Sequence, residues 1–383
     1  MNDTDKNWLV LANARIPGHQ IANLLEQFGS IEGILKAGAT AMQRAGLTPG
    51  AVRRLSRPDT ATIDRALAWL EAPNHHIVPI SCDDYPRLLL QIPDAPILLY
   101  ISGSPDALHL PALAIVGSRN PTQGGRRNAL EFATHLGQSG FCIQSGLAQG
   151  IDAAAHEGAL AGGACTVACL GHGIDRIYPE ENRGLAHKII AQGAVVSEYP
   201  LGSAPRREHF PERNRLISGC SMGTLVVEAA RRSGSLITAR LACEQGREVF
   251  AIPGSIHNTL SRGCHELIRQ GAKLVESAED IVSELGPIAG HLMQNREGKE
   301  SAVNKSVDRD VDYKLLIRVL DHDPATVDQI ADRCGLTIGQ VSSMLLILEL
   351  EGEIEALQGG RYSLIGSSSW HERKRTRRAD VSV

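Results

Sequence analysis

The strongest constraint on the fold is a regular alternation of short apolar runs and helix-length stretches between Ala112 and about Leu285. The runs are almost continuously apolar, which indicates strands that are buried on both faces. Because helix-length connections join parallel strands, the pattern predicts an α/β fold with a Rossmann-like, doubly wound parallel sheet. The expected strands cover residues 112–116, 141–145, 166–170, 194–198, 224–228 and 248–253.

The residues before this alternation predict a helical domain over 1–72. Apolar residues between Ile21 and Leu35 recur at three- and four-residue steps, which is the period of a helix. The run GLTPGAVRRL then places a glycine turn before a helix that carries Arg53 and Arg54. It is similar to helix-hairpin-helix modules, which hold DNA backbones on turn amides, and we expect a SAM- or helix-hairpin-helix-like domain. A plain helical bundle with solvated arginines is the alternative.

The α/β pattern belongs to an extended domain over 73–285, and two further segments follow it. Residues 286–310 lose apolar periodicity and are rich in polar residues, so they predict a linker. Residues 311–366 contain three expected helices and two short strand-like runs around a Gly-Gly pair, which is the layout of a winged helix. The tail, 367–383, is basic and predicts disorder.

Composition restricts the partners that the chain can bind. The 39 Lys and Arg residues face 43 Asp and Glu residues, so the net charge is −4 and any nucleic acid must be held by a local basic patch. The chain shows no signal-like start and no apolar stretch of about 18 residues, so we expect a cytoplasmic protein that does not contact membranes.

Its 8 cysteines form no CxxC pair, which favours free structural thiols over a zinc site. We expect neither a metal nor a cofactor.

Glycine-bearing segments follow the first three expected strands. They are Gly117-Ser118-Arg119-Asn120-Pro121, the run from Ser145-Gly146 to Asp152, and the run from Gly171 to Asp175. In a parallel sheet the carboxyl ends of neighbouring strands meet, so these segments predict a cradle for phosphate groups, with Arg119 as a forked donor. Neither GxGxxG nor GxxxxGK[ST] occurs, which argues against dinucleotide binding and NTP hydrolysis.

A second group of candidates lies on an expected helix that begins near Pro211. Arg213 and Arg215 project about 200° apart on a helix, so we expect one of them to face the cradle and the other to pair elsewhere, for example with a carboxylate. Ser233-Gly234-Ser235 opens a later helix, where a hydroxyl can cap the helix or touch a phosphate. His156 is interpreted as a structural histidine.

The motifs taken together resemble one protein family. AIVGSRNPT, SGLAQGIDAAAH, GHGIDRIYPEEN, HFPERNRLISGCS, VVEAARRSGSLITA and GREVFAIPG stand in the order and spacing of the DNA-processing protein A family, also called DprA or Smf. The resemblance implies a dimer that binds single-stranded DNA and loads RecA recombinase on DNA entering during natural transformation, without catalysis. By matching motifs it assigns the DNA-binding role to Gly117, Ser118, Arg119, Ser145, Gly146, Asn182, Arg213, Asn214, Arg215 and Ser235.

Two other functional classes stay open. Rossmann-like enzymes that cleave nucleoside monophosphates carry PGGxGTxxE, whereas residues 221–228 here lack the leading PGG and place Glu228 one position late. A transcriptional regulator would read duplex DNA with its winged helix. The expected third helix of that domain offers Thr337 and Gln340 but almost no positive charge, which suits protein contact better than a DNA groove.

Overall fold

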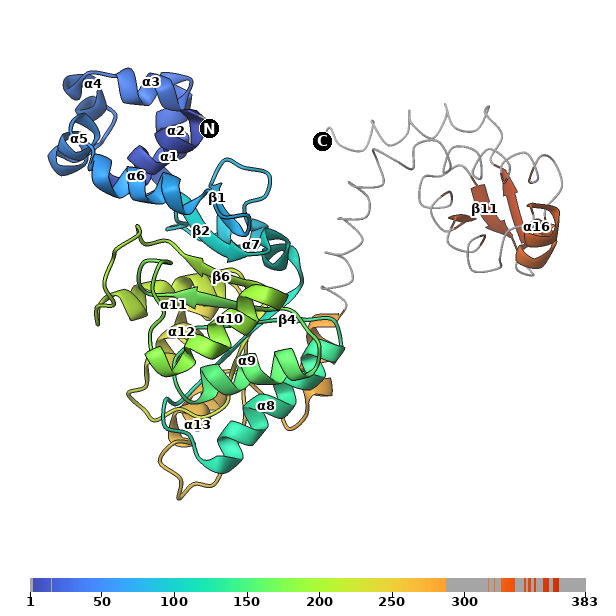
Figure 1. The fold of residues 1–383 in the computed structure, drawn as a ribbon. Helices are drawn as coiled ribbons and strands as arrows, with labels where there is room; N and C mark the ends of the chain where they lie inside the picture. Colours follow the sequence, from blue (N-terminus) through green and yellow to red (C-terminus); the bar gives the residue numbers. More distant parts are fainter. Residues whose placement is uncertain are drawn as a thin grey trace, which may run out of the picture. The chain divides into compact units, whose positions relative to one another are not determined.

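The computed structural model describes residues 3–14 and 16–286, and farther along it describes 316, 320, 325–334, 341, 344, 345, 348, 354–357 and 361–364. The chain forms two compact units, Met1–Met293 and Gln294–Val383. The first unit holds a sheet of nine strands, and the second holds a sheet of three (Figure 1).

The large sheet has the strand order β1-β2-β6-β5-β4-β3-β7-β8-β9. Strands β3 to β9 pair in parallel, as predicted for β3 to β8, whereas β1 and β2 add an antiparallel edge next to β6. The bounds are β1 His75–Pro79, β2 Leu98–Gly103, β3 Ala112–Val116, β4 Cys142–Ser145, β5 Thr166–Leu170, β6 Ala194–Ser197, β7 Gly223–Val226, β8 Glu248–Ala251 and β9 Lys273–Leu274.

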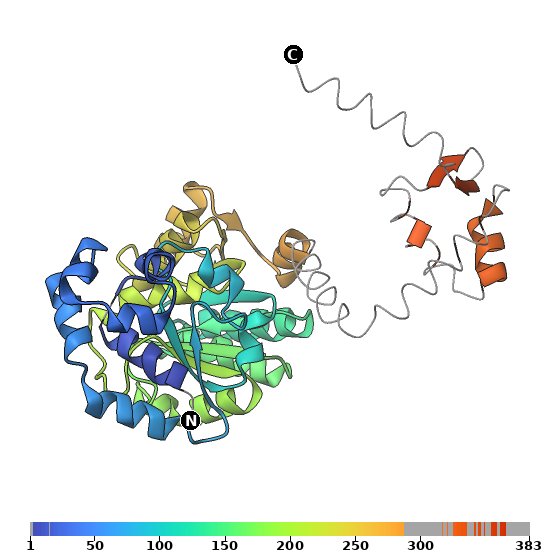
Figure 2. The same ribbon diagram turned by 90° about the horizontal axis from the view of Figure 1, so that it is seen from above.

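The strand order reverses between β3 and β7, which makes this point the topological switch of the sheet. The chain proceeds from β3 outward through β4, β5 and β6, and then returns to β7 on the other side of β3. Because parallel crossovers are right-handed, the helices of the two halves cover opposite faces (Figure 2). They are α8 Gln123–Gln138, α9 Ile151–Ala161 and α10 Arg183–Gln192 on one face, and α11 His209–Gly219, α12 Gly234–Glu244 and α13 Arg262–Arg269 on the other.

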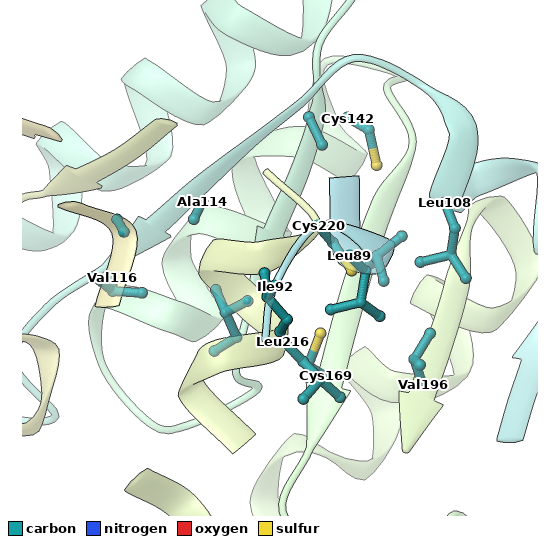
Figure 3. Close-up of a cluster of buried hydrophobic side chains, with 14 of the residues drawn as sticks. Leu89, Ile92, Leu108, Ala114, Val116, Cys142, Cys169, Val196, Leu216 and Cys220 are labelled. Carbon is teal, nitrogen blue, oxygen red and sulfur yellow. The ribbon is translucent and has the colours of Figure 1, made fainter. Parts of the chain in front are cut away.

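Buried apolar side chains from α7, from α11 and from the sheet pack together in the layer between α11 and the sheet (Figure 3). Leu89, from the short helix α7 (Arg87–Leu90), packs with Leu216 of α11 over Val116 and Val196 of the sheet. The thiols of Cys142, Cys169, Cys220 and Cys264 are buried in the same cluster. They act there as small apolar side chains, in agreement with the interpretation of the cysteines.

Six helices precede the sheet and form the predicted helical segment. Their bounds are α1 Asp3–Asn13, α2 Gly18–Phe28, α3 Ile31–Lys36, α4 Ala39–Arg44, α5 Pro49–Ser56 and α6 Thr60–Trp69. Thr48 caps α5 and Pro49 opens it, as the GLTPG turn suggested. Arg54 donates from Nε to the carbonyl of Ala14 at 2.9 Å, so this arginine ties the helices together. Their apolar cluster continues onto Tyr100 of β2.

The C-terminal unit contains a short helix and an antiparallel sheet in the order β10-β12-β11. The bounds are β10 Ala325–Thr326, α16 Val327–Cys334, β11 Ile354–Leu357 and β12 Arg361–Leu364. The predicted hairpin of the winged helix is therefore present. Most of the expected helices at 311–321 and 337–352 lies outside the described residues, as do 287–310 and 367–383.

Within the described part of the chain, no helix has both the length and the apolar character needed to cross a lipid bilayer.

The crossing of α8 and α9 depends on Gly158, which yields a stability prediction. A Cβ at Gly158 would lie 2.3 Å from the carbonyl oxygen of Leu130, which is a backbone atom and cannot move aside cheaply. We expect Gly158→Ala to lower the free energy of unfolding by about 1–3 kcal/mol, although alanine is the better helix former. Urea unfolding followed by circular dichroism measures the effect.

Gly184→Ala in α10 is the matched control, because no atom lies within 4 Å of the added Cβ. This variant is expected to be neutral or slightly more stable. Equal behaviour of the two variants would contradict the argument from helix crossing.

Candidate functional site

The carboxyl ends of β3, β4 and β5 lie side by side, so the three glycine-bearing segments meet at one edge of the sheet. Helix α11 lies beside this edge and packs against β5. The predicted convergence of the three strand ends is thus confirmed. The detailed chemistry of the edge, however, differs from the expected phosphate cradle in two respects.

First, the glycines make room for protein atoms. A Cβ at Gly117 would lie 2.7 Å from the side chain of Ile151, at the start of α9. A Cβ at Gly146 would lie 2.6 Å from the guanidinium of Arg213. The space that we expected an anion to use is therefore filled by Ile151 and Arg213, and the reason for glycine here is close packing.

Second, three of the backbone amides at this edge donate to carboxylates of the protein. Asp152 accepts from the amides of Gly146 at 3.1 Å and Ala148 at 3.4 Å. Glu228, beyond β7, accepts from the amide of Thr122 at 2.8 Å and from its hydroxyl at 2.7 Å. These carboxylates meet the positive ends of α9 and α8, where an anion would otherwise bind. These three amides are therefore held by the protein, and phosphate binding by the other amides of the three segments stays a prediction.

Neither carboxylate could be assigned this task from the sequence. Glu228 stands 106 residues from Thr122, so no local spacing links them. Asp152 stands six residues from Gly146, and the turn that brings them together depends on Gly150, whose φ is +85°. The Gly-Ile-Asp sequence after that turn is the one signal that could have indicated a carboxylate folding back on the preceding loop.

Arg213 is the central buried charge of the site, with only 4% of its surface exposed. Its guanidinium donates to the carbonyl of Gly146 at 2.8 Å and to the carbonyl of Cys169, and so joins the ends of β4 and β5. Burial lowers the pKa of Arg213, and the negative charge of Asp152 opposes that change. Burial likewise raises the pKa of Asp152, and Arg213 opposes this shift. Each charge therefore stabilises the other in a site that is almost completely buried.

Arg215 points away from this edge. It donates to Glu198 at 2.5 Å and pairs with Asp94 at 2.9 Å, and its side chain is 15% exposed. One arginine faces the strand ends while the other pairs with carboxylates, as the helical spacing predicted. The assignment of a direct DNA contact to Arg215 is not supported by this position, since both partners of its guanidinium belong to the protein.

A partly exposed cluster of two aromatic rings and two arginines covers the buried core of the site. The guanidinium carbon of Arg119 lies 5.5 Å from the ring centre of Phe210, and that of Arg213 lies 6.0 Å from it. The ring of Tyr178 lies 5.9 Å from Phe210, and 48% of Tyr178 is exposed. A Cβ at Gly171 would come within 3.1 Å of Phe210, so this glycine admits the ring. We call Arg119, Tyr178, Phe210 and Arg213 the arginine–aromatic cluster.

The remaining predicted residues serve the structure around this cluster. Ser145 is fully buried and donates to the carbonyl of Ile115 at 2.6 Å, so it cannot reach a ligand at the surface. The other four are half-buried or buried and hold loops or helix starts. Ser118 accepts from the amide of Asn120, Asn182 donates to Leu147, Asn214 donates to Gly234, and Ser235 contacts the capping Ser233. Among the ten predicted residues, Arg119 alone is exposed.

Two residues that could have indicated catalysis have structural partners. Both carboxylate oxygens of Glu228 are engaged by Thr122, and the residue is 7% exposed. His156 is fully buried, and its Nδ1 lies 2.7 Å from the hydroxyl of Thr166, in agreement with a structural role. Over the described ranges of the chain, no three His, Cys, Asp or Glu side chains are grouped to hold a metal ion.

Comparisons with known proteins add to this geometry. The family model described as DNA recombination-mediator protein A matches residues 76–286, and the DprA winged helix domain matches residues 300–360. Protein Smf of Escherichia coli is 42% identical over 323 residues, covering 84% of this chain and 86% of the relative.

Two solved structures are also similar. DNA processing protein A from Streptococcus pneumoniae aligns with a TM-score of 0.66 at 39% identity, covering 74% of this chain and 99% of that one. DNA processing protein A from Helicobacter pylori, described for its single-stranded DNA binding mode, aligns with a TM-score of 0.51 at 29% identity, covering 55% of this chain and 95% of that one. These matches confirm the predicted fold class, a Rossmann-like sheet with a winged helix domain.

The burial of His156 predicts that the fold is sensitive to acid. Burial, with a smaller effect of the Arg213 charge, lowers the pKa of His156 to about 3. As the pH falls below 6.5 the unfolded chain binds a proton at this position, whereas the folded chain does not until the pH approaches 3. His156 therefore costs the fold about 2 kcal/mol of stability between pH 7 and pH 5.

His156→Gln cannot titrate and is expected to lose about 2 kcal/mol less than the wild type over this pH range. Urea unfolding of both proteins at the two pH values measures the difference. Parallel losses in the two proteins would show that His156 is protonated in the folded state or does not contribute.

Proposed function

This chain belongs to the DNA recombination-mediator protein A family, also called DprA or Smf, and from that premise we propose that it binds single-stranded DNA at the arginine–aromatic cluster. The observation that carries the proposal is the exposed guanidinium of Arg119 beside the rings of Phe210 and Tyr178. It combines a forked donor for phosphate with aromatic faces for bases, which are the two groups that a single strand presents.

The positive charge is local, as the composition requires. Arg119 is exposed, and no ion pair or side-chain hydrogen bond to it occurs among the described residues. Arg213 lies behind Phe210 and adds positive charge without being exposed. A chain of net charge −4 can therefore attract a phosphodiester at this edge.

The rings favour a single strand over a duplex. Tyr178 is half exposed and tilted by 37° against Phe210, so part of its ring is accessible to a base. A base in a duplex is already stacked and paired, whereas an unpaired base can leave its neighbours and stack on a tyrosine. The structure described for the Helicobacter pylori relative, in terms of single-stranded DNA binding, supports this choice of ligand.

The biological role that we propose follows the family. The protein would hold DNA that enters the cell during natural transformation and deliver it to RecA recombinase, acting as a homodimer in the cytoplasm. The description of the family as a recombination mediator supports this role. The engagement of Glu228 by Thr122 supports binding without catalysis, because cleavage of a nucleoside monophosphate would need this carboxylate free.

Removal of the Arg119 side chain tests the site. We expect Arg119→Ala to weaken binding to a short single strand by at least about tenfold. The slope of log K against log salt should also fall by about 0.7 for each phosphate that the variant no longer neutralises. Fluorescence anisotropy of a labelled oligonucleotide over a salt series measures both quantities.

Arg127→Ala is the matched control, because Arg127 is equally a surface arginine but pairs with Glu131 at 2.7 Å on α8. It should leave the affinity unchanged. An unaltered affinity in Arg119→Ala would remove the basis of the proposed site.

Tyr178 tests the stacking argument separately. Tyr178→Ala should weaken single-strand binding by about 1–3 kcal/mol, whereas Tyr178→Phe keeps the ring and should bind nearly as well as the wild type. The salt slope should be the same in all three proteins, because the ring neutralises no phosphate. A loss in Tyr178→Phe that equals the loss in Tyr178→Ala would assign the effect to the hydroxyl instead of the ring.

A further inference from the structure

A basic hollow lies outside the arginine–aromatic cluster. It has a volume of about 540 Å³ and is lined by Arg231, Arg232, Glu266, Arg269 and Gln270. Arg231 and Arg232 belong to the loop between β7 and α12, and the other three residues lie at the end of α13 and just beyond it. Glu266, Arg269 and Gln270 share one face of the helix, since they are three and four residues apart.

The three arginines of this hollow are not neutralised by the protein. All three are exposed, and none of them forms an ion pair with a carboxylate in the described part of the chain. Some exposed arginines elsewhere do have such partners, as Arg127 has Glu131 and Arg240 has Glu244. Glu266 contributes one negative charge, so the lining keeps an excess of positive charge over a small area.

The hollow is connected to the proposed DNA site by hydrogen bonds on two sides. Thr122, three residues after Arg119, donates to Glu228, which stands three residues before Arg231. On the other side, Asn214 of α11 donates to the carbonyl of Gly234 at 3.3 Å, two residues after Arg232. The loop that carries Arg231 and Arg232 is therefore held between the loop of Arg119 and the helix of Arg213.

We propose that this hollow binds backbone phosphates of a second stretch of the same DNA strand, a proposal that rests on the proposed function. Guanidinium groups from two elements can grip a phosphodiester from two sides. No aromatic residue lines the hollow, so it contacts the backbone without stacking on bases. A strand that fills only the arginine–aromatic cluster does not reach the hollow, and a longer strand occupies both.

The dependence of affinity on strand length tests this proposal. The full-length protein and a variant with Arg231→Ala, Arg232→Ala and Arg269→Ala are titrated with single strands of about 3 and about 20 nucleotides over a salt series. We expect the variant to bind the short strand like the wild type and the long strand at least about tenfold more weakly. Its salt slope for the long strand should fall by about 2, or about 0.7 for each phosphate released.

A control variant removes the same number of exposed basic side chains from other elements, with Arg44→Ala, Arg127→Ala and Lys188→Ala. It separates a local effect from a change in net charge, and it should match the wild type for both strands. A long-strand loss of equal size in the control variant would overturn the proposal. Circular dichroism confirms that both variants fold.

The remaining outcomes separate the two proposals. Wild-type affinity of the hollow variant for the long strand, or equal losses for both lengths, would refute a second site while leaving the first intact. Arg119→Ala should weaken both lengths. If the wild type binds neither strand, the proposed function itself is wrong, and the second site is wrong with it.

Discussion

The buried guanidinium of Arg213 is the interaction on which the organisation of the site depends. It reaches from α11 to the carbonyl groups that end β4 and β5, and its charge is balanced by Asp152 in a region that is almost completely buried. An unpaired charge there would be strongly destabilising. The fold must therefore bring α11, the loop after β4 and the carboxylate of Asp152 close to one another. The same guanidinium lies against Phe210, and Arg119 lies against that ring as well. The buried and the exposed arginine therefore share one aromatic ring.

The fold uses its usual anion positions for its own carboxylates. In open α/β sheets the loops at the switch point and the helix starts beyond them commonly hold a ligand phosphate. Here Asp152 and Glu228 take the positions at the starts of α9 and α8. The groups that remain exposed to a ligand here are side chains such as those of Arg119 and Tyr178. They suit a flexible polymer lying across the surface better than a nucleotide inserted between the strand ends. This arrangement agrees with the absence of a dinucleotide fingerprint from the sequence.

The distribution of charge restricts where the protein would hold DNA. With a net charge of −4, attraction to a polyanion must come from places where arginines are free of carboxylate partners. Arg119 is one such place, and the hollow of Arg231, Arg232 and Arg269 is another. The loops that carry them are joined through Thr122 and Glu228, an interaction that also closes the switch point of the sheet. The short loop after β7 therefore links the switch point of the sheet to the proposed binding surface.

Local sequence patterns were enough to predict strands β3 to β8, their parallel pairing and the convergence of three glycine-bearing segments, because apolar runs separated by helix-length stretches permit few other folds. The antiparallel pairing of β1 and β2 and the short strand β9 were not predicted. They also predicted that one of Arg213 and Arg215 would face inward, since helical geometry is local. Only the tertiary structure showed that Arg213 is the inward one. It also showed that Ser145 and the amide of Gly146 form hydrogen bonds within the protein. Folding also assembled the hollow, whose arginines come from two elements. These outcomes depend on contacts between residues far apart in the chain, such as Thr122 and Glu228, and no local pattern encodes the distance between them.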